Sequence, residues 1–154
     1  MHQGAISCDP EFETAEAVSN HLLVVTRDAL FSGDMEAYCA RFHIPSVLRT
    51  SETVTHITNK AQLEEIFQGM QRYIHDTGAI DLHRVVTSAR FLSADKIECH
   101  FESRWVTANH HLSQPRRNSG IAELRHGRWT IMSSAYDVSN NALLHMALSR
   151  KGAS

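Results

Sequence analysis

Two long segments with alternating side chains, joined by a short polar turn, constrain the fold of this chain more than any other feature. They cover residues 80–92 and 97–108, and the turn between them is Ser93-Ala94-Asp95-Lys96. Segments rich in β-branched and aromatic residues around so short a turn favour two long antiparallel strands. The second half of the chain is therefore expected to be built around an antiparallel sheet.

The first half of the chain predicts three helices. Residues 14–31 carry apolar side chains at spacings of three and four, which is typical of an amphipathic helix. Asp34 is placed to cap a short second helix at 35–42. Asn59 has the form of the first residue of a capping box, and the third helix that it opens is expected to end before Gly78.

Shorter strands are expected around the long pair. The segment 47–57 is predicted to form a small hairpin, and the segments 121–124 and 129–138 are predicted to form a second one. Residues 110–119, which contain Pro115, are predicted to form a polar loop between the long pair and the second hairpin.

Helices first and strands afterwards are typical of the α+β class. All 154 residues are expected to form one domain, with a curved sheet wrapped over the helices of the first half. Residues 1–12 are predicted to be a flexible tail. Residues 140–154 are predicted to hold a last helix at 142–150, capped by Asn140 or Asn141, and a short tail.

The charge balance and the cysteines narrow the classes of partner and compartment. Fifteen Lys and Arg against seventeen Asp and Glu give a net charge of −2, so neither nucleic acid nor a membrane is expected as a partner. The three cysteines are widely scattered, which favours free thiols in a reducing compartment. The N-terminus lacks the basic start and apolar core of a signal peptide, so a cytoplasmic protein is expected.

Metal and cofactor sites are not expected. The sequence contains eleven histidines but no HExxH motif, no CxxC motif and no glycine-rich phosphate loop. His110 and His111 are adjacent, so their side chains would point in opposite directions in an extended segment. We therefore expect no metal and no organic cofactor.

Four short motifs follow one another in a characteristic order along residues 14–138. They are Ser32-Gly33-Asp34 before Tyr38, Ile44-Pro45-Ser46-Val47, Asn59-Lys60-Ala61-Gln62-Leu63, and Gly127-Arg128-Trp129-Thr130-Ile131. In this order they resemble the nuclear-transport-factor-2-like superfamily, which includes SnoaL-like and ketosteroid-isomerase-like domains. The resemblance implies a cystatin-like cone in which a bent sheet and three helices often enclose a cavity. It also implies a homodimer through the outer face of the sheet.

The strand at 80–92 offers the sharpest hypothesis for catalysis. Asp81 and His83 share one face of it because side chains alternate along a strand. We expect this face to point inward, since it also carries the apolar residues Val85, Ala89 and Phe91. A carboxylate that orients an imidazole suits general acid or base catalysis, with His83 as acid or base and Asp81 as its partner.

A structural interpretation of the same residues stays open. In it, Asp81 lies at a solvated strand end and His83 is half-buried and bonded to a neighbour. With the strand facing the other way, Arg84 would be the inward polar group, and the catalytic hypothesis would fail.

The next strand presents an apolar row to the expected cavity: Ile97, Cys99, Phe101, Ser103 and Trp105. Trp105 is a candidate wall for a flat ligand, with plain core packing as the alternative. Further candidates for ligand contact are aromatic or imidazole side chains, some of them near the cavity mouth that the resemblance implies: Tyr38, Phe42, His43, Tyr73 and Tyr136.

Two functions from different classes fit these features. The first is a small-molecule-binding cone for a largely hydrophobic ligand, with proton-transfer chemistry of the isomerase, dehydratase or hydrolase type if it is an enzyme. The second is a non-catalytic dimerisation or assembly module, such as a small subunit of a larger oxygenase. A shared scaffold does not choose between them.

Overall fold

The computed structural model describes residues 8–138 and 142–148. Its helices are α1 (Ala15–Ser32), α2 (Met35–Cys39), α3 (Lys60–Thr77) and α4 (Ala142–Leu148). Its strands are β1 (Phe42–Thr50), β2 (Val54–Ile57), β3 (Ala79–Ser93), β4 (Lys96–Thr107), β5 (Arg116–Arg125) and β6 (Arg128–Tyr136).

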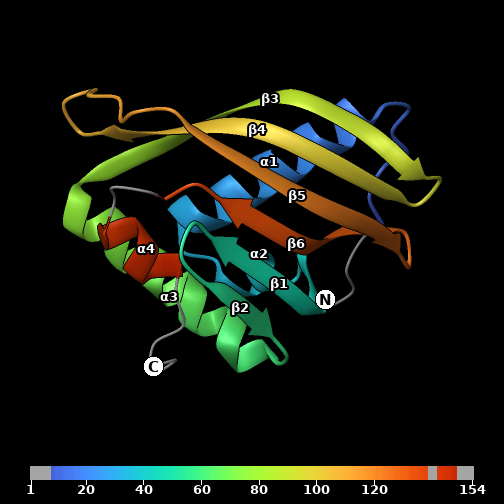
Figure 1. Cartoon of the computed structure of the whole chain (residues 1–154), viewed down its shortest axis with the longest axis horizontal. Coiled ribbons are helices and arrows are strands. Elements are labelled where there is room, and N and C mark those ends of the chain that lie inside the picture. The colour runs from blue at the N-terminus through green and yellow to red at the C-terminus, as the bar shows by residue number, and fades with distance from the viewer. Residues whose placement is uncertain (1–7, 139–141, 149–154) are drawn as a thin grey trace.

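The strands form one six-stranded sheet in the order β2-β1-β6-β5-β4-β3. Neighbours are antiparallel except β1 and β6, which are parallel, so the sheet is mixed rather than wholly antiparallel. The sheet curls strongly over α1, and α3 and α4 pack together at one end of the molecule (Figure 1). It does not close into a barrel, because β2 and β3 remain its edges. The α+β class, with a curved sheet around helices, is confirmed.

The helix ends form where the sequence predicted them. The Asp34 carboxylate accepts a hydrogen bond from the Ala37 amide at 3.0 Å, and the Asn59 side chain accepts one from the Gln62 amide at 3.0 Å. The Gln62 side chain completes a shifted capping box, because it accepts from the Thr58 amide and not from Asn59. Helix α3 ends at a left-handed glycine, Gly78, with φ of 69°.

Three predicted boundaries are wrong by several residues, and pairing in the sheet explains them. Helix α2 ends at Cys39, and β1 begins at Phe42 rather than at Val47, because Phe42 already pairs with Ile131. Strand β5 begins at Arg116 within the predicted loop, because residues 116–120 pair with residues 99–103 of β4. Tertiary pairing has overridden the polar composition of that segment.

The long pair of strands, β3 and β4, confirms the predicted hairpin but contains a bulge. From Leu82 to Val86 the even-numbered residues of β3 face the inside, as the pairing of Leu82 with Trp105 shows. The register shifts by one residue between Val86 and Ser88, which leaves Thr87 unpaired. Beyond this bulge the odd-numbered residues face inward, because an extra residue inverts the alternation.

The hydrophobic core has two parts. The larger one joins α3 and α4 to β1 and includes Leu48, Leu63, Phe67, Met70 and Leu148. The smaller one joins the first turns of α1 to the middle of the sheet, and it includes Val18, Leu22, Ile97, Ala122 and Trp129.

The segment before α1 is tied to the sheet by one carboxylate. Asp9 accepts two hydrogen bonds from Arg41, at 2.9 and 3.0 Å, and one from the Trp129 amide at 2.9 Å. Phe12 packs against the smaller core. Residues 8–12 are therefore part of the fold, although the sequence predicted a tail there.

Helix α4 lies where the last helix was predicted. Its predicted caps, Asn140 and Asn141, and the residues from 149 onward lie outside the described residues, as do residues 1–7. Within the described ranges, no helix combines the length and the apolar character needed to cross a membrane.

Candidate functional site

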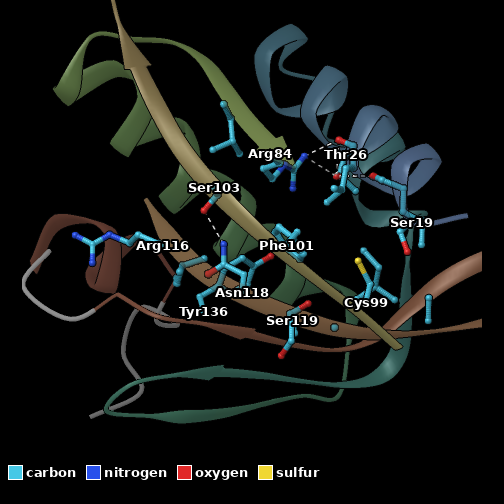
Figure 2. A pocket seen from close by; sticks show the side chains of 18 of the residues that line it. Ser19, Thr26, Arg84, Cys99, Phe101, Ser103, Arg116, Asn118, Ser119 and Tyr136 are labelled. Atoms are coloured by element: carbon cyan, nitrogen blue, oxygen red, sulfur yellow. Dashed lines mark hydrogen bonds between the residues drawn. The ribbon is translucent and has the colours of Figure 1, made fainter. Parts of the chain in front are cut away.

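A cavity of about 90 Å³ lies between α1 and the inner face of strands β3 to β6. Figure 2 shows side chains from all of these elements converging on it. The predicted row on β4, from Ile97 to Trp105, forms one wall, and Leu22, Leu23 and Leu30 of α1 form the facing wall. The cavity is thus mostly apolar, as sites for small organic molecules usually are.

The deepest charged group in this cavity is the guanidinium of Arg84. Its Nη2 donates to the Leu23 carbonyl at 2.6 Å and to Thr26 Oγ1 at 3.1 Å, so Arg84 reaches from β3 to α1 (Figure 2). Its Nε is fully enclosed and has no hydrogen-bond partner among the described residues. A buried donor without an acceptor is uncommon and calls for an explanation.

Arg84 has no acidic partner in the described chain. Every ion pair found there involves other basic residues, including Arg27, which pairs with Asp81 and Asp28. Burial lowers the pKa of Arg84 below its ordinary value, because the charged form loses hydration. An arginine side chain nevertheless keeps its proton in proteins, so the cavity holds an uncompensated positive charge.

The first residues of β5 supply a second polar group. The Asn118 amide donates to Ser103 Oγ at 2.6 Å, and its carbonyl oxygen accepts from the Asp137 amide at 3.3 Å. Both side chains are buried, and both line the cavity. The sequence analysis missed Asn118 because it placed residues 110–119 in a loop. The alternation of Asn118, Gly120 and Ala122 is the signal that could have revealed the strand.

The predicted catalytic pair does not reach the cavity. His83 is exposed on the outer face of the sheet, opposite Arg104 on β4, so the prediction that its face points inward is wrong. Asp81 is partly exposed and accepts from Arg27 Nε at 2.6 Å. That hydrogen bond holds the pKa of Asp81 below its ordinary value. The bulge at Thr87 is the physical reason, since Ala89 points inward although Val85 does not.

Four of the six predicted ligand-contact residues line the cavity: Tyr38, Phe42, Trp105 and Tyr136. Burial raises the pKa of the Tyr38 phenol well above its ordinary value, so this group is a neutral hydrogen-bond donor.

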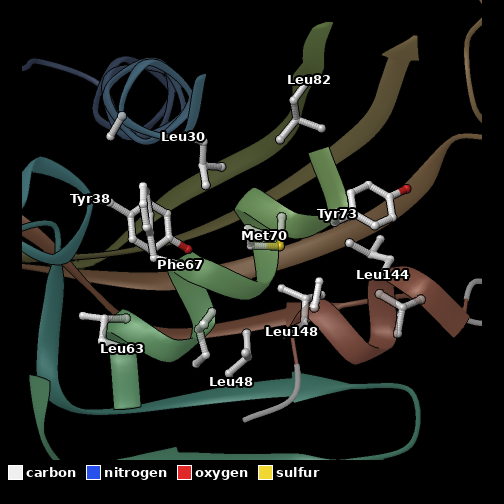
Figure 3. Close-up of a cluster of buried hydrophobic side chains, with 14 of the residues drawn as sticks. Leu30, Tyr38, Leu48, Leu63, Phe67, Met70, Tyr73, Leu82, Leu144 and Leu148 are labelled. Atoms are coloured by element: carbon white, nitrogen blue, oxygen red, sulfur yellow. The ribbon is translucent and has the colours of Figure 1, made fainter. Parts of the chain in front are cut away.

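The other two candidates lie elsewhere. Tyr73 packs in the core against Trp105, with ring centroids 4.8 Å apart, and Figure 3 shows it beside Leu144. His43 Nδ1 donates to the Pro45 carbonyl at 2.8 Å, and its Nε2 contacts Arg125 at the surface. Neither residue is among those that line the cavity.

No group of three His, Cys, Asp or Glu side chains lies close enough to share a metal ion, as far as residues 8–138 and 142–148 are concerned. The cavity lining contains Arg84, Arg116 and Asp137 as its ionised residues, and the last two lie where β5 begins and β6 has ended.

Comparison with known proteins identifies the fold. No protein-family model and no curated protein matches the chain. Among solved structures, a domain of unknown function with a cystatin-like fold from Nostoc punctiforme is 15% identical, with a TM-score of 0.65 over 82% of this chain and 78% of that one. An NTF-2-like protein of unknown function from Shewanella oneidensis is 14% identical, with a TM-score of 0.63 over 79% and 97%.

A ketosteroid isomerase-like protein from Erwinia carotovora is 16% identical, with a TM-score of 0.58 over 82% of this chain and 97% of that one. Likenesses at this level of identity establish the architecture and leave the chemistry to the site itself. They confirm the resemblance that the sequence motifs indicated: the chain has the nuclear-transport-factor-2-like, or cystatin-like, fold.

Proposed function

We propose that this protein binds a small, largely apolar molecule in the cavity between α1 and the sheet. The observation that carries this proposal is the cavity itself, which has apolar walls and a few convergent polar groups. A structural core of this size would be expected to pack without such a space, since protein interiors are close-packed.

The size of the cavity limits the ligand. Its volume of about 90 Å³ is smaller than the ~150 Å³ of an engineered apolar cavity that holds benzene. A molecule with a handful of non-hydrogen atoms fits the enclosed part. A longer ligand would have to extend toward the rim near Arg116 and Asp137.

The lining favours binding over proton transfer. No His or Glu is found among the described residues that line the cavity, and Asp137 is exposed at its rim. Burial raises the pKa values of Tyr38 and Cys99, so neither is poised to exchange a proton near neutral pH. The geometry therefore supports a binding role better than the acid–base role predicted for His83.

A cavity-filling variant tests this proposal. Cys99 lines the cavity from β4, and Cys99→Met would extend a flexible side chain into it. We expect a small cyclic ketone to raise the melting temperature of the wild-type protein, because a ligand that binds only the folded state stabilises it. The variant should lose this response.

The matched control is His100→Met, which places the same side chain on the outer face of the same strand, where His100 is exposed. It should keep the response to the ketone. If Cys99→Met kept the response to the ketone as fully as His100→Met does, the ligand would lie outside the cavity, and this result would contradict the proposal.

A homodimer through the outer sheet face is a second proposal, and it is compatible with the first. The exposed row there mixes Val85 with charged neighbours such as Glu102, which lies opposite it. Such a mixture of apolar and charged side chains is typical of non-obligate protein interfaces.

A further inference from the structure

We propose that the ligand is a monocarboxylate, whose anionic head pairs with Arg84 while its short apolar chain lies along the walls of the cavity. This inference rests on the proposed binding function and names its chemical class. Three observations lead to it: an enclosed donor without an acceptor, an unpaired charge, and phenols that line the same cavity.

The donor inventory of Arg84 is the first observation. A guanidinium offers N–H donors in a planar fork that matches the two oxygens of a carboxylate. The protein uses Nη2, which holds Leu23 and Thr26, and leaves the enclosed Nε without an acceptor. A ligand oxygen that accepts from Nε would satisfy this enclosed donor, which the described chain leaves unmatched.

The local charge is the second observation. Arg27 lies near Arg84 and lowers its pKa through charge repulsion, but the Asp81 and Asp28 carboxylates are both bonded to Arg27. Asp137, the acidic residue of the lining, is exposed at the rim where β6 has ended. Arg84 therefore carries a buried charge that no bonded carboxylate balances, and an anion would be attracted to it strongly because the surroundings are poor in water.

The phenols are the third observation. Tyr38 and Tyr136 both line the cavity, and both lie near enough to Arg84 to interact with its charge. A neutral phenol can donate to the second oxygen of a carboxylate bound at Arg84. This arrangement would recognise a carboxylate through charge and hydrogen bonds from different elements.

The count of charges selects a monoanion. A single buried cation balances a single negative charge, whereas phosphate carries up to two at neutral pH and would leave one of them desolvated. The apolar walls, including Phe101 and Trp105, likewise favour a ligand with a hydrocarbon part over a bare inorganic ion.

The test compares butanoate with butanamide, a neutral molecule of nearly the same shape, by titration calorimetry on the full chain in chloride-free buffer. For the wild-type protein we expect butanoate to bind at least about tenfold more tightly than butanamide, as hydrogen bonds to charged groups are the stronger ones. Inorganic phosphate should give no measurable heat.

Two variants probe Arg84. Arg84→Met should lower the affinity for butanoate by about tenfold or more and leave that for butanamide within about threefold. Its melting temperature should be equal to or above that of the wild type, because an unpaired buried charge is replaced by an apolar side chain. Arg84→Lys keeps the charge without the fork, and it should bind butanoate with intermediate affinity.

Arg27→Met is the matched control. Arg27 is a neighbouring cation that is already paired with Asp81, so its loss should leave the preference for butanoate intact. Arg27→Met could instead lose as much affinity for butanoate as Arg84→Met does. The effect would then come from the overall positive charge of the region, and the specific role of Arg84 would be overturned.

The remaining outcomes separate this inference from the proposed function. If butanoate and butanamide bind equally and Cys99→Met blocks both, the cavity binds ligands but the carboxylate inference fails. Phosphate binding as tight as that of butanoate would also overturn it. If neither organic molecule nor the cyclic ketone binds, the proposed function itself fails.

Discussion

Asp9 joins three distant parts of the chain through a side chain that is only 4% exposed. Its carboxylate contacts Arg41 after α2, the Trp129 amide in β6, and His21 Nε2 in α1 at 3.1 Å. We expect Asp9→Asn to lower the free energy of unfolding by about 2 to 4 kcal/mol, because breaking a buried ion pair leaves Arg41 without its partner. Urea unfolding at neutral pH measures this change.

The pH dependence gives an independent check on Asp9. Burial alone would raise its pKa, but the hydrogen bonds from Arg41 and Trp129 outweigh burial and hold the pKa below its ordinary value. The stabilisation is therefore present above about pH 4, the range of an unfolded Asp, and is lost as the pH falls through the lower folded pKa. Stability curves of wild type and Asp9→Asn should converge in acid. Asp28→Asn, in an exposed pair, should change stability by less than about 0.5 kcal/mol.

The sequence allowed some of the candidate site to be predicted at the residue scale. The inward row on β4 was predictable, because apolar and charged side chains alternate there without interruption. The inward residue of β3 was not. Val85, Ala89 and Phe91 suggest one continuous face, and nothing in their identity shows that Thr87 is unpaired between them. The sequence analysis named Arg84 only as the inward residue if this strand faced the other way, and the structure shows that orientation.

Helix α4 depends on a glycine of α3 for its close approach. A Cβ added at Gly69 would lie 2.4 Å from the Ala147 carbonyl oxygen. We expect Gly69→Ala to lower stability by about 1 to 3 kcal/mol through overpacking, although alanine is the better helix former by about 1 kcal/mol. Thermal unfolding measures the loss, and amide exchange should show weaker protection in α4.

Gln68→Ala is the control for this change, because Gln68 is the exposed neighbour on the same helix. It should be neutral or slightly stabilising. Stabilisation by Gly69→Ala would show that α4 does not approach α3 as closely as the structure has it.

Elements with strong local signals were predictable, and those set by pairing were not. The caps at Asp34 and Asn59 and the glycine at position 78 fix three helix ends through their own chemistry. The start of β5 carries no such signal. Its polar residues Asn118 and Ser119 look like a loop, because the hydrogen bonds that make them a strand come from β4 and β6.

At the scale of the whole molecule, the order of motifs was enough to indicate the fold but not its contents. The same scaffold can hold cavities of different chemistry. In this chain the register of β3 decides which of its side chains line the cavity. Oligomeric state is likewise a property of surfaces that local patterns do not specify. The exposed outer face, which includes Val85 on the edge strand β3, carries the homodimer proposal.

Light scattering after size exclusion tests that proposal. The wild-type protein should elute as a dimer at micromolar concentration, and Val85→Glu should elute as a monomer of unchanged fold, because it places a carboxylate opposite Glu102 in the interface. Leu112→Glu, an exposed apolar residue away from β3, should leave the dimer intact. A monomeric wild type would contradict the proposal.

The unpaired Thr87 gives this fold an economical route to new chemistry. If Thr87 were instead paired in a regular ladder, with the downstream half of β3 kept in its present register, the upstream half would turn over. The cavity would then exchange an arginine for a histidine and an aspartate, although no side chain had been substituted. The loss of one bulge can thus convert the proposed anion-binding cavity into one suited to acid–base catalysis, so the position of the bulge is as informative about function as residue identities.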